Sequence, residues 1–92
     1  MSHTVREKAK LLARVRRIRG QIDAVERALE SEQGCGAVLQ LVSAVRGAIR
    51  GLMGELMEDH IRMHVVDPAR ERNTKRARGA EELIDVVRAY LK

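Results

Sequence analysis

Four residues of the chain have side chains that commonly bind transition metals, and they include its three histidines and its single cysteine: His3, Cys35, His60 and His64. His60 and His64 are four positions apart, so on a helix both imidazoles lie on one face and can bind one metal ion. Each residue also has a simpler interpretation, as a terminal residue (His3), a small buried apolar residue (Cys35) or a pair of exposed histidines. One thiolate with several imidazoles favours borderline ions such as Ni(II), Co(II) or Zn(II).

These four residues can meet only if two copies of the chain contribute. Cys35 and His60 are 25 positions apart, roughly 37 Å along one helix at ~1.5 Å per residue. Two copies packed antiparallel about a centre near Ala48–Ile49 would place Cys35 of one copy beside the histidine pair of the other. If the chain turns back at residues 31–36, the two helices run antiparallel, and residues whose numbers sum to about 67 lie opposite each other. His3 then lies opposite the histidine pair of its own copy. The predicted site therefore forms twice in each dimer.

The elements that position these residues are predicted to be helices. Apolar residues recur in alternating steps of four and three along two stretches, which is a heptad pattern and differs from the alternation of a strand. Ser2 or Thr4 is a candidate cap at the start, and SEQGCG (residues 31–36) is the predicted break between the two helices. The two seams consist of Leu11, Val15, Ile18, Ile22, Val25 and Leu29, and of Val38, Val42, Val45, Ile49, Leu52 and Leu56.

A third, shorter helix is expected after the second one ends near His64 or Val65. Asp67 and Pro68 look like its cap and first residue, and Gly79 is a candidate interruption. Its apolar stripe is predicted to be Leu83, Val86, Val87, Tyr90 and Leu91. The predicted fold is all-α: one domain over residues 1–92, a three-helix protomer, an antiparallel dimer forming a four-helix bundle, and a dimer of dimers.

The composition supports assembly from several copies. The chain has 92 residues, no Phe or Trp, and one Tyr, so a single copy buries little apolar surface. A single cysteine excludes an internal disulfide and fits a reducing compartment, which leaves a metal or oligomerisation as the stabilising device. No apolar run near the ~20 residues of a membrane helix stands out, and MSHTVREKAK does not resemble a signal peptide. We therefore expect a cytoplasmic protein with no membrane segment.

The charge distribution indicates an anionic partner. Eighteen Lys and Arg against 13 Asp and Glu leave +5, and residues 1–20 hold seven basic side chains against one acidic. Arg6, Lys10, Arg14 and Arg17 share one helical face beside the apolar seam, with Arg16 and Arg19 on its other flank. Guanidinium suits phosphate, so nucleic acid is favoured over an anionic membrane or a merely solvated helix. The basic segment 70–78 is expected to be a charged loop, with additional phosphate contacts as the alternative.

Several stretches resemble the CsoR/RcnR family of small helical bacterial repressors: HTVREK, ARVRRIRGQIDAVERALE, AVRGAIRGLMGELMEDHI and VVRAYLK, together with Cys35. The resemblance covers nearly the whole chain. It implies dimers of three-helix protomers, usually assembled into tetramers, that bind operator DNA through basic residues and release it when an effector arrives. It also implies that Cys35, His60 and His64 occupy the effector positions.

The branches of this family differ at those positions. The copper(I)-sensing pattern has cysteine where this chain has His64, and persulfide sensing needs a second cysteine. The nickel- and cobalt-sensing RcnR branch resembles this chain most closely, and it implies a ligand set of Ser2, through its amine once Met1 is removed, with His3, Cys35, His60 and His64. The formaldehyde-sensing FrmR branch is the competitor, with Cys35 and the N-terminal amine as its reactive groups. That branch usually has proline where this chain has Ser2.

The predicted function is a metal-responsive transcriptional repressor. The metal-free tetramer binds double-stranded operator DNA, and Ni(II) or Co(II), with Zn(II) as a further candidate, releases it and derepresses a metal-efflux gene. Alternatives are a formaldehyde-responsive repressor, a metal-storage protein with no DNA role, and a DNA-coating protein. No nucleophile–base arrangement indicates an enzyme or a small-molecule substrate. The predicted DNA-binding residues are Lys10, Arg14, Arg16, Arg17 and Arg19.

Overall fold

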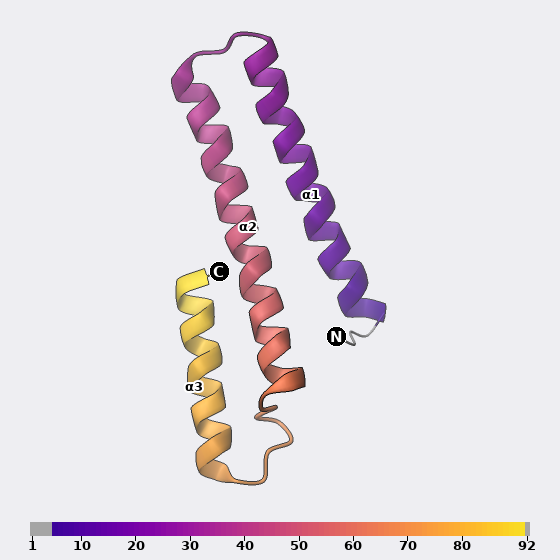
Figure 1. Cartoon of the computed structure of the whole chain (residues 1–92), viewed down its shortest axis with the longest axis vertical. Coiled ribbons are helices and arrows are strands. Elements are labelled where there is room, and N and C mark those ends of the chain that lie inside the picture. Colours follow the sequence, from indigo (N-terminus) through magenta and orange to yellow (C-terminus); the bar gives the residue numbers. More distant parts are fainter. Residues whose placement is uncertain (1–4, 92) are drawn as a thin grey trace. The chain divides into compact units, whose positions relative to one another are not determined.

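The protein is all-α, as its sequence predicts. The computed structural model describes residues 5–91, with side chains from Glu7 onward, and no strand occurs within this range. Three helices follow one another along the chain: α1 (Val5–Glu30), α2 (Cys35–His64) and α3 (Thr74–Leu91) (Figure 1). The predicted three-helix protomer is therefore confirmed.

The helices divide between two compact units, and the boundary falls inside α2. One unit runs to Leu52 and contains α1 with the N-terminal half of α2, whereas the other begins at Met53 and contains the C-terminal half of α2 with α3. The single domain over residues 1–92 stays a prediction.

A tight turn joins α1 to α2 in the first unit. The N–H of Gln33 donates to the carbonyl of Ala28 at 3.0 Å, and the N–H of Glu32 donates to that of Leu29 at 3.2 Å. Glu32 has a φ of 57°. This pair of bonds with a left-handed residue is a Schellman motif that ends α1. The carbonyl of Gly34 then accepts from two amides of the next helix, so α2 begins at Cys35 and the break is shorter than predicted.

The hairpin of α1 and the N-terminal half of α2 has a register close to the predicted one. The Arg14 guanidinium lies against Gly51, and Gln21 and Ala44 line one hollow. Both pairs agree with the predicted pairing to about half a helical turn.

Each predicted seam is only half covered in this unit. About half of the seam residues are partly buried, whereas the others are 37–60% exposed. The heptad pattern therefore combines two sets of apolar residues. One set packs between α1 and α2, and the other set stays exposed in a single copy. The partly buried residues are Leu11, Ile18, Val25, Val38, Val45 and Leu52, and the exposed ones are Val15, Ile22, Leu29, Val42 and Ile49.

The core of the second unit lies between α3 and the C-terminal half of α2. Ile61 of α2 packs with Ile84 and Val87 of α3, and Leu91 packs against this cluster. The predicted α3 stripe is therefore partly wrong. Val87 and Leu91 do face the core, but Ile84, at 0% exposure, is its centre. The other stripe residues, Leu83, Val86 and Tyr90, are 47–70% exposed.

The start of α3 also differs from the prediction. Asp67 and Pro68 begin a single turn, because the Asp67 side chain accepts the N–H of Ala69 at 3.0 Å and its carbonyl accepts two further amides. The cap of α3 is Asn73, whose Oδ1 accepts the N–H groups of Lys75 at 3.0 Å and Arg76 at 3.2 Å. Gly79 lies inside a continuous helix. Residues 74–78 are therefore helical and not part of a loop.

Helix α2 bears on the expectation that the chain has no membrane segment. By length and composition α2 could cross a membrane, contrary to the expectation from the sequence. The central helix of a soluble assembly passes the same test.

Candidate effector site and DNA-binding surface

The histidine pair, His60 and His64, lies on the exposed face of the last turns of α2. Their ring centroids are 5.0 Å apart and the rings are tilted by 41°, and both residues are exposed. The four-residue spacing thus places both imidazoles on one face, as predicted. Two adjacent imidazoles supply two of the nitrogen ligands that a borderline divalent ion takes.

The other predicted ligands lie elsewhere or outside the described range. Cys35 is exposed and is the first residue of α2, whereas the histidine pair is near the end of the same 30-residue helix. Among residues 5–91, no three or more His, Cys, Asp or Glu side chains form a group that could hold a metal ion. Ser2 and His3 fall outside the described residues, so their roles stay predictions.

Most of the predicted DNA-binding side chains on α1 are exposed. Lys10, Arg16, Arg17 and Arg19 are all exposed. Arg14 is different, because it is half-buried and its guanidinium lies against α2. The expectation that Arg14 belongs to a face clear of the helix contact is therefore wrong. Its position in the heptad, three residues after Leu11 and four before Ile18, points it toward the neighbouring helix.

Two small hollows in the first unit carry basic side chains. One, of about 250 Å³, is lined by Arg14, Arg17, Ile18, Gln21, Ala44 and Ala48. The buried Oε1 of Gln21 has no hydrogen-bond partner. The other, of about 240 Å³, is lined by Ser43, Arg46, Gly47 and Arg50 of α2. Neither hollow is lined by an acidic side chain, so both suit an anion.

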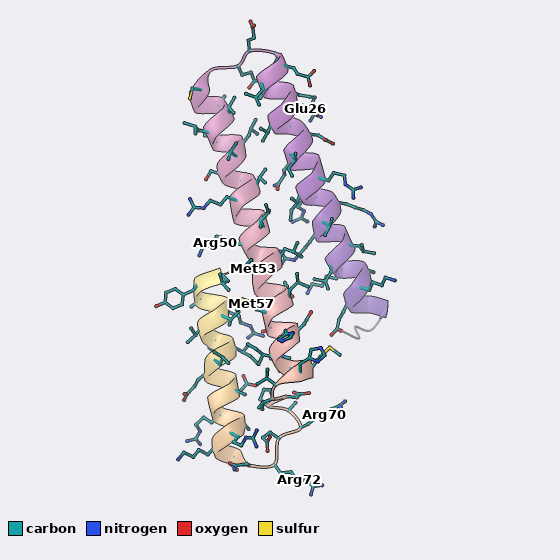
Figure 2. All side chains as sticks on the ribbon, in the orientation of Figure 1. Glu26, Arg50, Met53, Met57, Arg70 and Arg72 are labelled. Atoms are coloured by element: carbon teal, nitrogen blue, oxygen red, sulfur yellow. The ribbon has the colours of Figure 1, made fainter. Side chains whose placement is uncertain are left out.

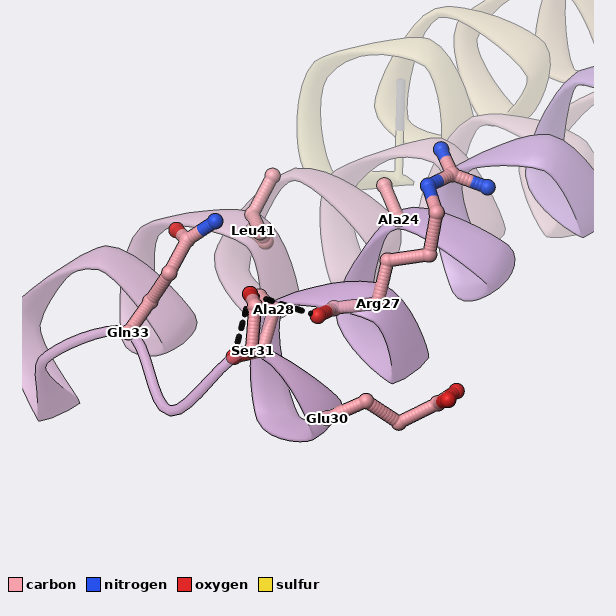
Figure 3. Close-up of a pocket in the computed structure, with 7 residues that line it drawn as sticks. All are labelled: Ala24, Arg27, Ala28, Glu30, Ser31, Gln33 and Leu41. Carbon is pink, nitrogen blue, oxygen red and sulfur yellow. Dashed lines mark hydrogen bonds between the residues drawn. The ribbon is translucent and has the colours of Figure 1, made fainter.

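A larger hollow beside the α1–α2 turn has a different character. Figure 3 shows its lining, in which the Ser31 hydroxyl donates to the carbonyls of Arg27 at 2.8 Å and Ala28 at 3.4 Å. Both carbonyls also accept backbone N–H groups, from Ser31 and Gln33, so the hydroxyl adds a second bond to each at the end of α1. The lining contains no histidine or cysteine, so we assign it a structural role.

An ion-pair cluster that sequence reasoning missed connects α3 to α2. Glu58, whose side chain is 11% exposed, forms ion pairs with Arg88 of α3, at 2.7 Å, and with Arg62, at 4.0 Å. Asp67 extends the cluster to Arg62 at 4.0 Å and to Arg70 at 3.8 Å. In Figure 2, Arg70 and Arg72 project from the loop before α3. The sequence does place Glu58 and Arg62 four residues apart, a spacing that suits an ion pair on one helix. The sequence does not show that a third helix adds Arg88 to this pair.

The sequence model of the metal-sensitive transcriptional repressors matches residues 7–89 of the chain. The match spans nearly the whole chain, and the chain therefore belongs to this family, the CsoR/RcnR family that its motifs resemble. Its members are transcriptional repressors and not enzymes.

Individual relatives agree with this assignment. The chain is 52% identical over 92 residues to an uncharacterised protein in the bioA 5′ region of Serratia marcescens, and the alignment covers 100% of both chains. It is 41% identical to the transcriptional repressor RcnR of Citrobacter koseri, again over 100% of both chains. A solved structure is also similar, that of a glutamate-to-histidine variant of the formaldehyde-responsive regulator FrmR from Salmonella enterica serovar Typhimurium. Its TM-score is 0.68 and its identity 47%, over 98% of this chain and 100% of that chain.

Proposed function

We propose that the protein is a repressor whose metal-free form binds operator DNA and whose Ni(II)- or Co(II)-bound form releases it, so that a metal-efflux gene is expressed. The observation that carries the proposal is the exposed histidine pair at the end of α2, with ring centroids 5.0 Å apart, in a chain of the metal-sensitive family. Two imidazoles at this spacing supply two of the five ligands of the proposed site.

The remaining ligands of the proposed site come from the N-terminus and from a second copy. His3 and the Ser2 amine belong to the chain that supplies the histidine pair, and Cys35 belongs to the partner copy. One thiolate, three imidazoles and an amine form a borderline donor set, which suits Ni(II) or Co(II), and also Zn(II), better than Cu(I). The exposure of Cys35 at the start of α2 leaves its thiol accessible to another copy.

Uncovered apolar residues support the antiparallel dimer and its further assembly into a tetramer. Val15, Ile22 and Leu29 of α1 and Val42 and Ile49 of α2 are 37–60% exposed and continue the two heptad seams. In a chain this small, a regular exposed apolar seam needs a partner surface. A second copy packed antiparallel about Ala48–Ile49 covers both α2 residues and completes the four-helix bundle.

Metal and DNA act on one element in this proposal. The N-terminal ligands lead directly into α1, which carries the exposed Lys10, Arg16, Arg17 and Arg19. Drawing the N-terminus to the histidine pair changes how α1 presents these charges to DNA. His3→Ala is therefore expected to keep DNA affinity and to weaken metal-driven release. A His3→Ala protein that responds like wild type would contradict this latch.

The test is fluorescence anisotropy of a labelled duplex from upstream of the protein's own gene, with a shuffled duplex as control, at fixed salt. The metal-free protein is titrated first, and Ni(II), Co(II), Zn(II), Cu(I) or formaldehyde is then added to the complex. We expect release by Ni(II) or Co(II) and none by formaldehyde. Binding that none of these effectors reverses would refute the proposal, and so would the absence of any DNA binding.

A formaldehyde response is the second candidate, favoured by the exposed Cys35 thiol. The thiol adds to the carbonyl of formaldehyde to give a hydroxymethyl thioether. The N-terminal amine then displaces water to leave a methylene bridge between sulfur and nitrogen. Release by formaldehyde but not by metals, abolished in Cys35→Ala and retained in His60→Ala, would establish this reaction instead.

A further inference from the structure

Gly51 differs from Gly20, Gly34, Gly36, Gly47 and Gly79 in what lies against it. A methyl group in place of its hydrogen would come within 2.9 Å of Nη1 of Arg14, which is closer than carbon atoms approach nitrogen without displacement. The corresponding position at Gly20, Gly47 or Gly79 has no neighbour within 4 Å. The Arg14 guanidinium therefore occupies space that exists only because residue 51 has no side chain.

The surroundings of this contact suit a phosphate group. Arg14 and Arg17 line the same hollow of about 250 Å³, and on the side of α2 it is lined only by Ala44 and Ala48. The α2 wall of this hollow therefore consists of small residues, and no acidic side chain lines the hollow. Two arginines that line one hollow can donate several charge-assisted hydrogen bonds to one phosphate.

We propose that Gly51 is a positioning residue for DNA binding: it holds the Arg14 guanidinium beside Arg17, where the two bind one backbone phosphate of duplex DNA. The inference rests on the proposed DNA-binding function and assigns a part of it to α2. An arginine restrained by packing loses less side-chain freedom on binding than one extended into solvent.

The substitution Gly51→Ala separates this role from folding. The new methyl group meets the flexible end of Arg14 and no backbone atom of another element, so the side chain moves while the helices stay in place. Alanine also has a higher helix propensity than glycine. The melting temperature of Gly51→Ala is therefore expected to equal or exceed that of wild type.

The experiment is a double-mutant cycle on the full-length protein. Wild type, Gly51→Ala, Arg14→Ala and the double variant are titrated against the labelled duplex at several salt concentrations. Gly79→Ala is the matched control, because it makes the same change inside a helix at a position with no neighbour within 4 Å. Melting temperature and mass by light scattering are measured for every variant.

We expect Gly51→Ala to bind DNA about tenfold more weakly, the effect of one charge-assisted hydrogen bond. Its plot of log affinity against log salt should be shallower by about 0.9 for each phosphate that the variant no longer binds. In the Arg14→Ala background the same substitution should change nothing, and Gly79→Ala should bind like wild type. Equal weakening in both backgrounds, or none in either, would overturn the inference. A wild-type protein that binds no DNA would instead refute the proposed function.

Discussion

At the scale of single residues, the proposed chemistry depends on the two imidazoles at the end of α2. His60→Ala and His64→Ala are each expected to weaken Ni(II) or Co(II) binding at least tenfold, because each removes a nitrogen ligand. Competition with a chromogenic chelator measures this affinity. Met63→Ala is the control, since Met63 is exposed beside His64 but points to another face of the helix. Unchanged affinity in both histidine variants would refute the proposed site.

A second residue-scale prediction concerns Arg88. Its guanidinium forms an ion pair with Glu58 at 2.7 Å, and the Glu58 side chain is 11% exposed. Arg88→Ala removes this close positive charge and keeps the more distant Arg62, and we expect a loss of about 1–3 kcal/mol in the free energy of unfolding. Arg70→Ala removes an arginine that is 89% exposed and 3.8 Å from Asp67, which is expected to cost at most about 1 kcal/mol. Equal effects in urea denaturation would show that burial does not set the strength of these pairs.

At the scale of the elements, the end of α1 contains an identifiable strain. Glu32 has a φ of 57°, a conformation that glycine adopts freely and that costs other residues about 1–2 kcal/mol. Glu32→Gly should therefore raise the free energy of unfolding by about 1 kcal/mol, measured by chemical denaturation. Glu32→Ala is the control, because it removes the charge and keeps the Cβ. If alanine stabilises the protein as much as glycine, the gain comes from the helix dipole and not from the backbone.

The elements also show what the sequence could and could not predict. The two heptad seams predicted α1 and α2, because the periodicity of Leu11, Ile18 and Val25 reports a real contact, and the turn at residues 31–36 predicted their register. The same periodicity could not tell which contact each residue makes. Val15 and Ile22 follow the same spacing, yet they are exposed in one copy. Apolar spacing indicates that a residue is buried in some contact, but it does not identify the helix or the copy against which the residue packs.

The start of α3 was mispredicted for a local reason. Aspartate before proline is a helix-cap signal, but Asp67 uses its side chain and its carbonyl to close one turn. Asn73 makes the actual cap.

The candidate site could also be predicted only in part. The spacing of His60 and His64 was sufficient for the pair. Spacing within α1 points Arg14 toward the neighbouring helix, but it does not identify Gly51 as the residue that Arg14 contacts.

At the scale of the whole molecule, the buried apolar residues of the described chain are few: Ala28, Ile61, Ala80, Ile84 and Val87. A core this small leaves a single copy marginally stable. The length and apolarity of α2, which would suit a membrane helix, then follow from its central place in the proposed bundle.

This gives a prediction for assembly. Ile49→Glu places a charge at the centre of the proposed dimer and should convert the oligomer to a smaller species by light scattering, with loss of helical content on dilution. Val65→Glu is the control, because Val65 is 63% exposed and lies beyond the end of α2. An unchanged mass for Ile49→Glu would mean that the copies do not pack about this residue.

The central claim is that metal and DNA compete through one protein, and reciprocal linkage tests it most directly. The affinity for Ni(II) or Co(II) is measured by chelator competition, once with free protein and once with protein saturated by its operator duplex. The account predicts weaker metal binding in the DNA complex, by the same factor as that by which metal weakens DNA binding, typically about 5- to 150-fold. Equal metal affinities in the two states would contradict it, because a ligand that does not distinguish them cannot release DNA.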